Sequence, residues 1–225
     1  ISNCLAAQET QAIKDPNAIY MGAVELFEKE QFALAYPIFQ TLSQQKINSI
    51  DDQVNGLNDD IQSRLTICRL RLIQPLAEQE ALDLVLRVKS KYLKEMLSFH
   101  LAHFYYQNDQ FEKAIEIYKN ADLQQLSNTQ IADAKFELAY ALFNQKQFRE
   151  AKDFFLEICQ LQGNKHQKQA YYYYGFISYF NKDYNNAFQA FNKVVEEKAY
   201  KNIVPYYLCE ILYAKGNKAL AMAYG

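Results

Sequence analysis

The stretch QFREAKDFF, residues 147–155, decides the fold of this chain. Phe148, Ala151 and Phe155 are spaced three and four residues apart, so they share one face of a helix. The same order of an aromatic residue, an alanine and a second aromatic residue recurs in QFALAYPIF (31–39), QFEKAIEIY (110–118) and DYNNAFQAF (183–191). Self-similarity of this kind predicts a protein built from helical repeats.

The shared alanine sets the length of the unit, and it stands at Ala35, Ala114, Ala151 and Ala187. The last three follow one another at 37 and 36 residues, whereas the first two are 79 residues apart, which is about two units. We therefore expect a more divergent copy over residues 65–92, with Pro75 in its turn and Ala81 at the alanine position.

A second apolar stretch precedes each of these segments, as in LSFHLAHFYY (97–106), KFELAYALF (135–143) and YYYYGFISYF (171–180). Each stretch holds a small residue, Ala102, Ala139 or Gly175, at the position where a neighbouring helix must come close. Short polar turns separate the two stretches. The unit is therefore expected to be a helix, a tight turn and a second helix.

The composition agrees with an all-helical fold and excludes several functions. Only 6 glycines and 4 prolines occur in 225 residues, which is about 4% of the chain, whereas average usage of these two residues is roughly 12%. That is too little turn chemistry for a sandwich, a barrel or a doubly wound sheet. A net charge of -2 gives no electrostatic case for binding nucleic acid. No stretch approaches the ~20 apolar residues of a membrane span.

These features together resemble the tetratricopeptide repeat (TPR) family over nearly the whole chain. The family's motif of a large residue followed later by Leu and a small residue is matched at Leu138–Ala139 and Leu101–Ala102, and Tyr174–Gly175 takes the same place. The sequence departs from the family pattern because it has no Trp and lacks the proline that closes each unit.

The resemblance implies an all-α fold, a right-handed α–α superhelix of about six helix–turn–helix repeats. We expect a single solenoid over residues 16–225. Its repeats are expected at about 17–46, 60–92, 93–125, 129–162, 165–199 and 202–225. The last repeat looks unfinished around Leu220, and its start, VPYY at 204–207, is aromatic-rich. The chain therefore looks like the N-terminal part of a longer bacterial envelope TPR protein.

Residues 1–15 are expected to form a leader outside the solenoid. The first eight are apolar and rich in small residues, like the tail of a secretory signal peptide, and cleavage after Ala7 would fit. Two alternatives stay open: Cys4 as a lipid-anchor cysteine, and a disordered cytoplasmic leader. Export predicts a periplasmic or outer-membrane-associated protein, and the second alternative predicts a cytoplasmic one.

The family also implies a binding surface, because the first helices of successive TPR units line a concave groove. Carrying those positions over gives twelve candidate groove residues, ten of them aromatic: Phe99, His103, Tyr106, Tyr140, Phe143, Tyr172, Phe176, Tyr179, Phe180, Tyr206, Glu210 and Tyr213. Aromatic anchors are enriched in binding surfaces because they bury a large area at low entropic cost. The alternative is that several of these rings belong to the core between helices.

No other chemistry is predicted. The basic residues with which some TPR domains hold a C-terminal carboxylate are absent from these positions, so an apolar or aromatic-rich segment is the expected ligand. His100 and His103 are three residues apart but have no third metal ligand nearby. The cysteines are far apart in sequence and are expected to pack as small hydrophobes. Phosphate loops and hydrolase or metalloprotease motifs are absent, so no enzyme, cofactor or metal is expected.

The sequence thus favours a non-catalytic scaffold that binds a protein or peptide segment in an aromatic groove, in an envelope complex. The alternative is a structural repeat module that packs against later domains of a longer chain or forms a homodimer.

Overall fold

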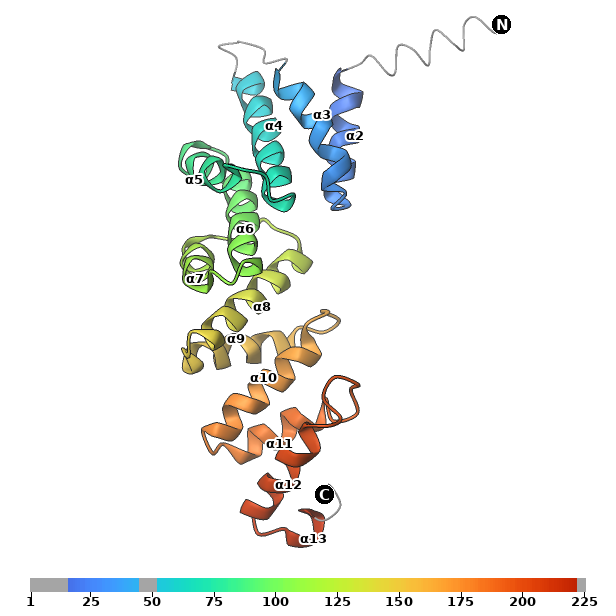
Figure 1. Ribbon diagram of the computed structural model, residues 1–225, viewed down its shortest axis with the longest axis vertical. Coiled ribbons are helices and arrows are strands. Elements are labelled where there is room, and N and C mark those ends of the chain that lie inside the picture. Colours follow the sequence, from blue (N-terminus) through green and yellow to red (C-terminus); the bar gives the residue numbers. More distant parts are fainter. Residues whose placement is uncertain (1–15, 45–51, 222–225) are drawn as a thin grey trace, which may run out of the picture. The chain divides into compact units, whose positions relative to one another are not determined.

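The computed structural model describes residues 16–44 and 52–221 of the chain, and within these ranges it is all-α, with no strand (Figure 1). The helices are α2 (Pro16–Glu28), α3 (Phe32–Gln44), α4 (Asp52–Arg71), α5 (Ala77–Arg87), α6 (Lys91–Gln107), α7 (Phe111–Asn120), α8 (Asn128–Asn144), α9 (Phe148–Gln160), α10 (Gln167–Phe180), α11 (Tyr184–Asn192), α12 (Val204–Ala214) and α13 (Lys218–Ala221). The predicted fold class, helical repeats without strands, is confirmed.

The helices gather into two compact units. The first unit contains α2 to α6 and residues 120–125, and the second contains residues 109–119 of the α7 region and everything described from Leu126 onward. In the first unit α4 packs against α3, α5 and α6; in the second α10 packs against both α9 and α11. The second expected repeat differs most in its bounds, because α4 already begins at Asp52 rather than near residue 60.

The tight turns between paired helices share one backbone conformation. The second residue after the helix end has positive φ in the turns at Glu30 (55°), Lys146 (59°), Lys182 (60°) and Gly216 (82°). In each turn the next amide donates back across the last helical turn, as from Gln147 N to Leu142 O at 2.9 Å. This is the Schellman ending, which satisfies orphan carbonyls at a helix C-terminus. Three of these four positions carry a side chain where glycine is the favoured residue.

The alanine that defines the repeat is fully buried in every copy: Ala35, Ala81, Ala114, Ala151 and Ala187 all have 0% exposure. The small residues of the first helices are buried as well. A Cβ added at Gly175 would lie 2.9 Å from Cδ1 of Phe191 and 3.3 Å from Cβ of Ala190. Contacts this short leave no room for a methyl group, so only glycine lets α11 pack this closely on α10.

Candidate functional site

The twelve predicted groove residues all lie on first helices of the repeats. Three are on α6 in the first unit, and nine are on α8, α10 and α12 in the second unit.

In the first unit the α6 residues are largely covered. Phe99 is only 4% exposed. Its ring meets His100 edge-on at 5.0 Å, and it stacks obliquely on His103, with the centroids 6.3 Å and the planes 26° apart. His103 and Tyr106 are half-buried. Phe99 therefore contributes to packing around α6 and offers little surface to a ligand.

In the second unit the nine residues lie in a row on α8, α10 and α12, which we call the aromatic face. It consists of Tyr140, Phe143, Tyr172, Phe176, Tyr179, Phe180, Tyr206, Glu210 and Tyr213. Tyr213 belongs to it by its helical spacing, three residues after Glu210 on α12. From α8 to α10 the row is joined by the ring contact of Phe143 with Phe176, at 5.7 Å. From α10 to α12 it is joined by Phe176 and Tyr179, which meet Tyr207 at 6.0 and 5.0 Å.

Two rings that join this row were missed by the sequence analysis. Tyr173 meets both Tyr140 and Phe143, at 5.5 and 5.1 Å, and Tyr207 joins α10 to α12. Both neighbour predicted residues in sequence, within the aromatic runs YYYY (171–174) and YY (206–207). The 3.6-residue period alone does not tell which ring of such a run faces a partner helix.

Exposure divides the aromatic face into two kinds of residue. Phe180, Tyr206 and Tyr213 are 62%, 61% and 64% exposed. The other six are half-buried; Tyr172, for example, stacks on Tyr200 with centroids 4.5 Å apart and the ring planes 8° from parallel. The half-buried rings hold the helices together, and the three exposed rings are available for contact with another molecule.

Glu210 is the single charged residue of the aromatic face. The Tyr179 hydroxyl donates a hydrogen bond to Oε2 of Glu210. Hydrogen bonds from Tyr179 and then Tyr206 hold the pKa of the Glu210 carboxyl below its usual value, because they stabilise the charged form. The same bond, together with burial, raises the pKa of Tyr179. Glu210 is therefore anionic and its neighbours are neutral phenols near pH 7.

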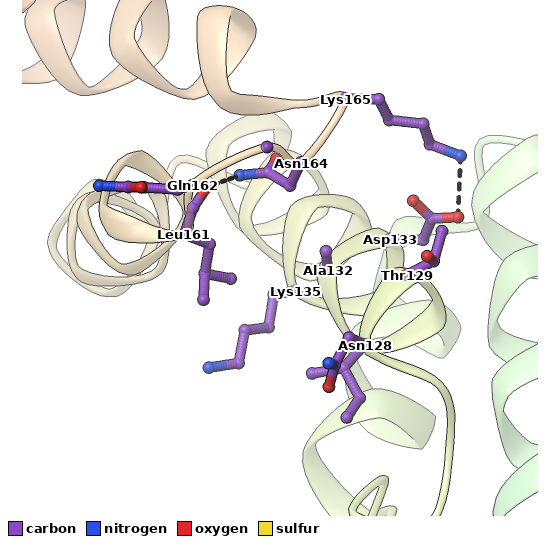
Figure 2. Close-up of a pocket in the computed structure, with 11 residues that line it drawn as sticks. Asn128, Thr129, Ala132, Asp133, Lys135, Leu161, Gln162, Asn164 and Lys165 are labelled. Atoms are coloured by element: carbon purple, nitrogen blue, oxygen red, sulfur yellow. Dashed lines mark hydrogen bonds and ion pairs between the residues drawn. The ribbon is translucent and has the colours of Figure 1, made fainter.

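A separate hollow of about 490 Å³ lies between the start of α8 and the connection from α9 to α10 (Figure 2). Leu161 and Ala132 form an apolar part of its lining. On its rim Lys165 Nζ pairs with Asp133 Oδ2 at 2.9 Å, and His166 Nε2 lies 2.8 Å from Oδ1 of the same carboxylate. Partial burial would raise the pKa of Asp133, but the hydrogen bonds with His166 and Lys165 outweigh it and lower that pKa. No residue of the aromatic face lines this hollow.

The first unit has a hollow of about 820 Å³ between the start of α4 and residues 87–93. Its lining combines Asp59 and Asp60 with Arg87 and Lys89. It holds none of the three predicted α6 residues.

The residues that sequence analysis considered as metal or thiol sites lie in packed positions. His100 is buried beside Phe27 and Phe32, and the described residues contain no group of three metal-ligating side chains. Cys68, Cys159 and Cys209 are free thiols. Burial raises the pKa of both Cys68 and Cys159 to about 12. Cys4 and the predicted leader lie outside the described residues.

Nothing in the described helices combines the length and apolar character that a bilayer span requires.

Comparison with known proteins identifies the family. Residues 54–213, well over half of the chain, match the family model of Iml2/Tetratricopeptide repeat protein 39. The chain therefore belongs to the Iml2/Tetratricopeptide repeat protein 39 family, and the predicted resemblance to TPR proteins is confirmed. No curated protein shows significant sequence similarity to the chain.

Solved TPR structures share the fold. The chain matches Pseudomonas aeruginosa PilF with a TM-score of 0.61 and 13% identity, covering 93% of this chain and 88% of PilF. It matches the C-terminal part of a TPR repeat-containing protein from Cytophaga hutchinsonii with a TM-score of 0.62 and 22% identity, covering 91% and 76%. A TPR protein from Parabacteroides merdae gives a TM-score of 0.56 at 14% identity, covering 93% and 77%. At these identities the likeness shows the fold alone.

Proposed function

We propose that this member of the Iml2/Tetratricopeptide repeat protein 39 family is a non-catalytic scaffold whose aromatic face binds a segment of a partner protein. TPR-containing relatives support the general role of an interaction scaffold. The finer proposal concerns the place of binding, and it rests on the exposed aromatic side chains of the second unit.

The observation that carries the proposal is the exposure of Phe180, Tyr206 and Tyr213 beside the half-buried rings of the same face. Rings in one row can be covered together by one extended segment. Hot spots at protein interfaces are enriched in rigid aromatic side chains surrounded by packed neighbours. Covering the exposed part of each ring would contribute on the order of 1 kcal/mol or more to binding.

The half-buried rings of the face also support the proposal because they fix the exposed ones. Phe180 packs against Phe176 at 4.6 Å and against Tyr179 at 5.2 Å, and Tyr206 lies against Tyr207 at 5.9 Å. A side chain held by its neighbours loses less conformational entropy when a ligand covers it. The face is therefore organised before binding.

The test is a selection of randomised dodecapeptides displayed on phage against the whole immobilised chain. A double variant, Phe180→Ser with Tyr206→Ser, removes the exposed rings of α10 and α12. Both side chains are more than half exposed, so the variant is expected to fold, which circular dichroism checks. Peptides selected on the unchanged chain should lose at least about tenfold in affinity for the variant, the equivalent of 1.4 kcal/mol.

The first unit offers a matched control. Ile73 and Leu86 are 74% and 84% exposed apolar side chains, and the variant Ile73→Ser with Leu86→Ser removes a similar amount of exposed apolar surface. It should bind the selected peptides like the unchanged chain. A selection that enriches no peptide, or peptides that bind both variants equally, would refute the aromatic face as the binding surface.

A further inference from the structure

Glu210 is the single charge among the aromatic side chains of the aromatic face. It is the only charged residue of α12, and the other eight residues of the face are Phe or Tyr. On α10 the only charged residue is Lys168, at the opposite end of the helix from Phe180. The middle of the exposed aromatic surface thus carries one negative charge.

The carboxylate keeps room for a further partner. A carboxylate offers about four acceptor positions, and the hydroxyls of Tyr179 and Tyr206 occupy two of them. Among the described residues, none of the lysines or arginines forms an ion pair with Glu210. Charged groups on protein surfaces usually find water or a counter-charge, so this carboxylate can accept a cation brought by another molecule.

The two nearest lysines along the chain are engaged with other groups. Lys215 Nζ donates to Oδ1 of Asn185 at 2.7 Å and lies 6.0 Å from the centroid of the Phe188 ring. Lys218 Nζ lies 5.7 Å from the centroid of the Tyr213 ring. The ring faces at this end of the second unit therefore already attract cations of the chain itself, as the quadrupole of an aromatic ring would.

We propose that Glu210, together with Phe180, Tyr206 and Tyr213, binds an arginine side chain of the partner segment. This inference rests on the proposed function, which it sharpens by naming the chemistry of the partner. The partner segment would place its arginine at Glu210 and apolar side chains on the neighbouring rings. Binding is then specified by charge as well as by apolar area.

Arginine fits this site better than lysine for two physical reasons. Its planar guanidinium can donate two parallel hydrogen bonds to one carboxylate, whereas the lysine ammonium is a compact point charge. The guanidinium is also weakly hydrated and stacks on aromatic faces, so the exposed rings at Tyr206 and Tyr213 can cover its two sides. An acidic partner segment would instead meet Glu210 with like charge and be rejected.

The experiment uses three displayed dodecapeptide libraries that differ only at one central position. This position is arginine, glutamine or glutamate, and the flanking positions are randomised in the same way. Against the unchanged chain, the arginine library is expected to yield binders about tenfold tighter than the glutamine library, the usual size of one charge-assisted hydrogen-bonded pair. The advantage should fall as salt concentration rises.

Two variants make the result specific to Glu210. The isosteric variant Glu210→Gln should remove the arginine advantage while leaving the glutamine library unchanged. The variant Glu210→Lys should move the preference to the glutamate library. Both changes are at a surface position, and circular dichroism checks that each variant is folded.

The outcomes separate the two proposals. If no library binds, the proposed function fails and this inference fails with it. If arginine and glutamine libraries bind the unchanged chain equally, or if Glu210→Gln keeps the arginine advantage, only this inference is overturned. A lysine-centred library that binds as tightly as the arginine library would overturn the choice of arginine.

Discussion

The two units of this chain fill their interiors with different chemistry. In the first unit several charged and polar side chains are buried among the apolar ones, including Arg64, Glu95 and His100 at 3–5% exposure. In the second unit no arginine, lysine or histidine is buried among the described residues, although Glu137 is, and the interior holds the rings of Phe155 and Phe191 at 0% exposure. Both units contain buried rings, but the first also buries a cation and the second relies on a larger network of ring contacts.

Arg64 shows how the first unit accommodates a buried charge. Its Nε donates to Asp60 Oδ2 at 2.9 Å and its Nη1 to Glu28 Oε1 at 2.8 Å. The guanidinium also lies 4.8 Å from the centroid of the Phe27 ring. A buried cation is tolerated when hydrogen bonds and opposite charges replace its water. Arg64 thereby links α2 to α4 within the first unit.

In the second unit stacked rings link neighbouring helices. Phe155 stacks on Tyr173 at 5.1 Å, and Phe191 stacks on Tyr207 at 5.2 Å with their planes 10° from parallel. Such ring pairs contribute about 0.5–1.5 kcal/mol beyond the burial of their area. A helix that supplies rings to both its packed side and its open side leaves some of them exposed. The aromatic face is therefore an extension of the core of its own unit.

The largest effect on stability is expected from removing a buried ring of the second unit. Phe191→Ala removes a fully buried ring that packs against Tyr207 and Gly175, and should destabilise the second unit by about 3–5 kcal/mol. Hydrogen exchange of the whole chain, analysed by mass spectrometry, should show faster exchange in α10, α11 and α12. Equal loss of protection in α2 to α6 would contradict the separation of the two units.

A somewhat smaller effect on stability is expected from removing the buried arginine of the first unit. Arg64→Met keeps much of the side-chain volume but leaves Asp60 without its buried cation, and should cost about 3 kcal/mol. Exchange should accelerate in α2 and α4. The matched control is Arg87→Met, at an exposed position near the end of α5, which should change stability by less than about 0.5 kcal/mol.

The stability of the first unit should also depend on pH through His100. Burial, and then the nearby cations Arg71, His103 and Arg64, hold the pKa of His100 well below its usual value of 6.5. Between the lowered pKa and 6.5 the unfolded chain binds more protons than the folded one, so folding stability rises with pH. The contribution is complete above about pH 6.5 and is lost as the pH falls below it.

The variant His100→Met isolates this dependence because methionine fills the site without a titratable group. The Nδ1 atom of His100 has no hydrogen-bond partner in the structure, so the substitution removes no bond from it. Protection factors for α6 should fall from pH 7 to pH 5 in the unchanged chain and fall less in the variant. An identical pH dependence in both proteins would exclude His100 as the cause.

The smallest effect is expected at the turns. Lys146 has a φ of 59°. A residue with a Cβ is strained in this left-handed conformation, whereas glycine is not. Lys146→Gly should therefore stabilise the second unit by about 0.5–1 kcal/mol, and Lys146→Ala, which keeps a Cβ, should not. Thermal melts of the three proteins measure the difference. A destabilised glycine variant would show that the turn is not strained.

Much of the fold could be predicted because the repeats produce a periodic pattern of residues in the sequence. The recurring alanine predicts a buried contact, and its positions Ala114, Ala151 and Ala187 have no exposed surface. Gly175 was expected where helices approach closely, and its distance to Phe191 shows why. The left-handed turn residues Lys146 and Lys182 could not be predicted, because they lack the glycine that signals this conformation at Gly163 and Gly216.

The candidate site could be predicted only in outline. Helical spacing places the aromatic residues on the first helices, but it does not separate a buried ring such as Phe99 from an exposed one such as Phe180. That separation depends on which neighbouring helix covers each ring. The hydrogen bond from Tyr179 to Glu210 joins residues 31 positions apart, and no local pattern in the sequence encodes it.

The central claim is that the aromatic face of the second unit binds a partner segment. Hydroxyl-radical footprinting of the whole chain, with and without a saturating arginine-centred peptide from the selection, tests it most directly because aromatic side chains report their own exposure. Phe180, Tyr206 and Tyr213 should lose most of their oxidation when the peptide is bound, while exposed Leu86 of the first unit should keep its own. Unchanged oxidation of the three rings, or protection at Leu86 instead, would contradict the claim.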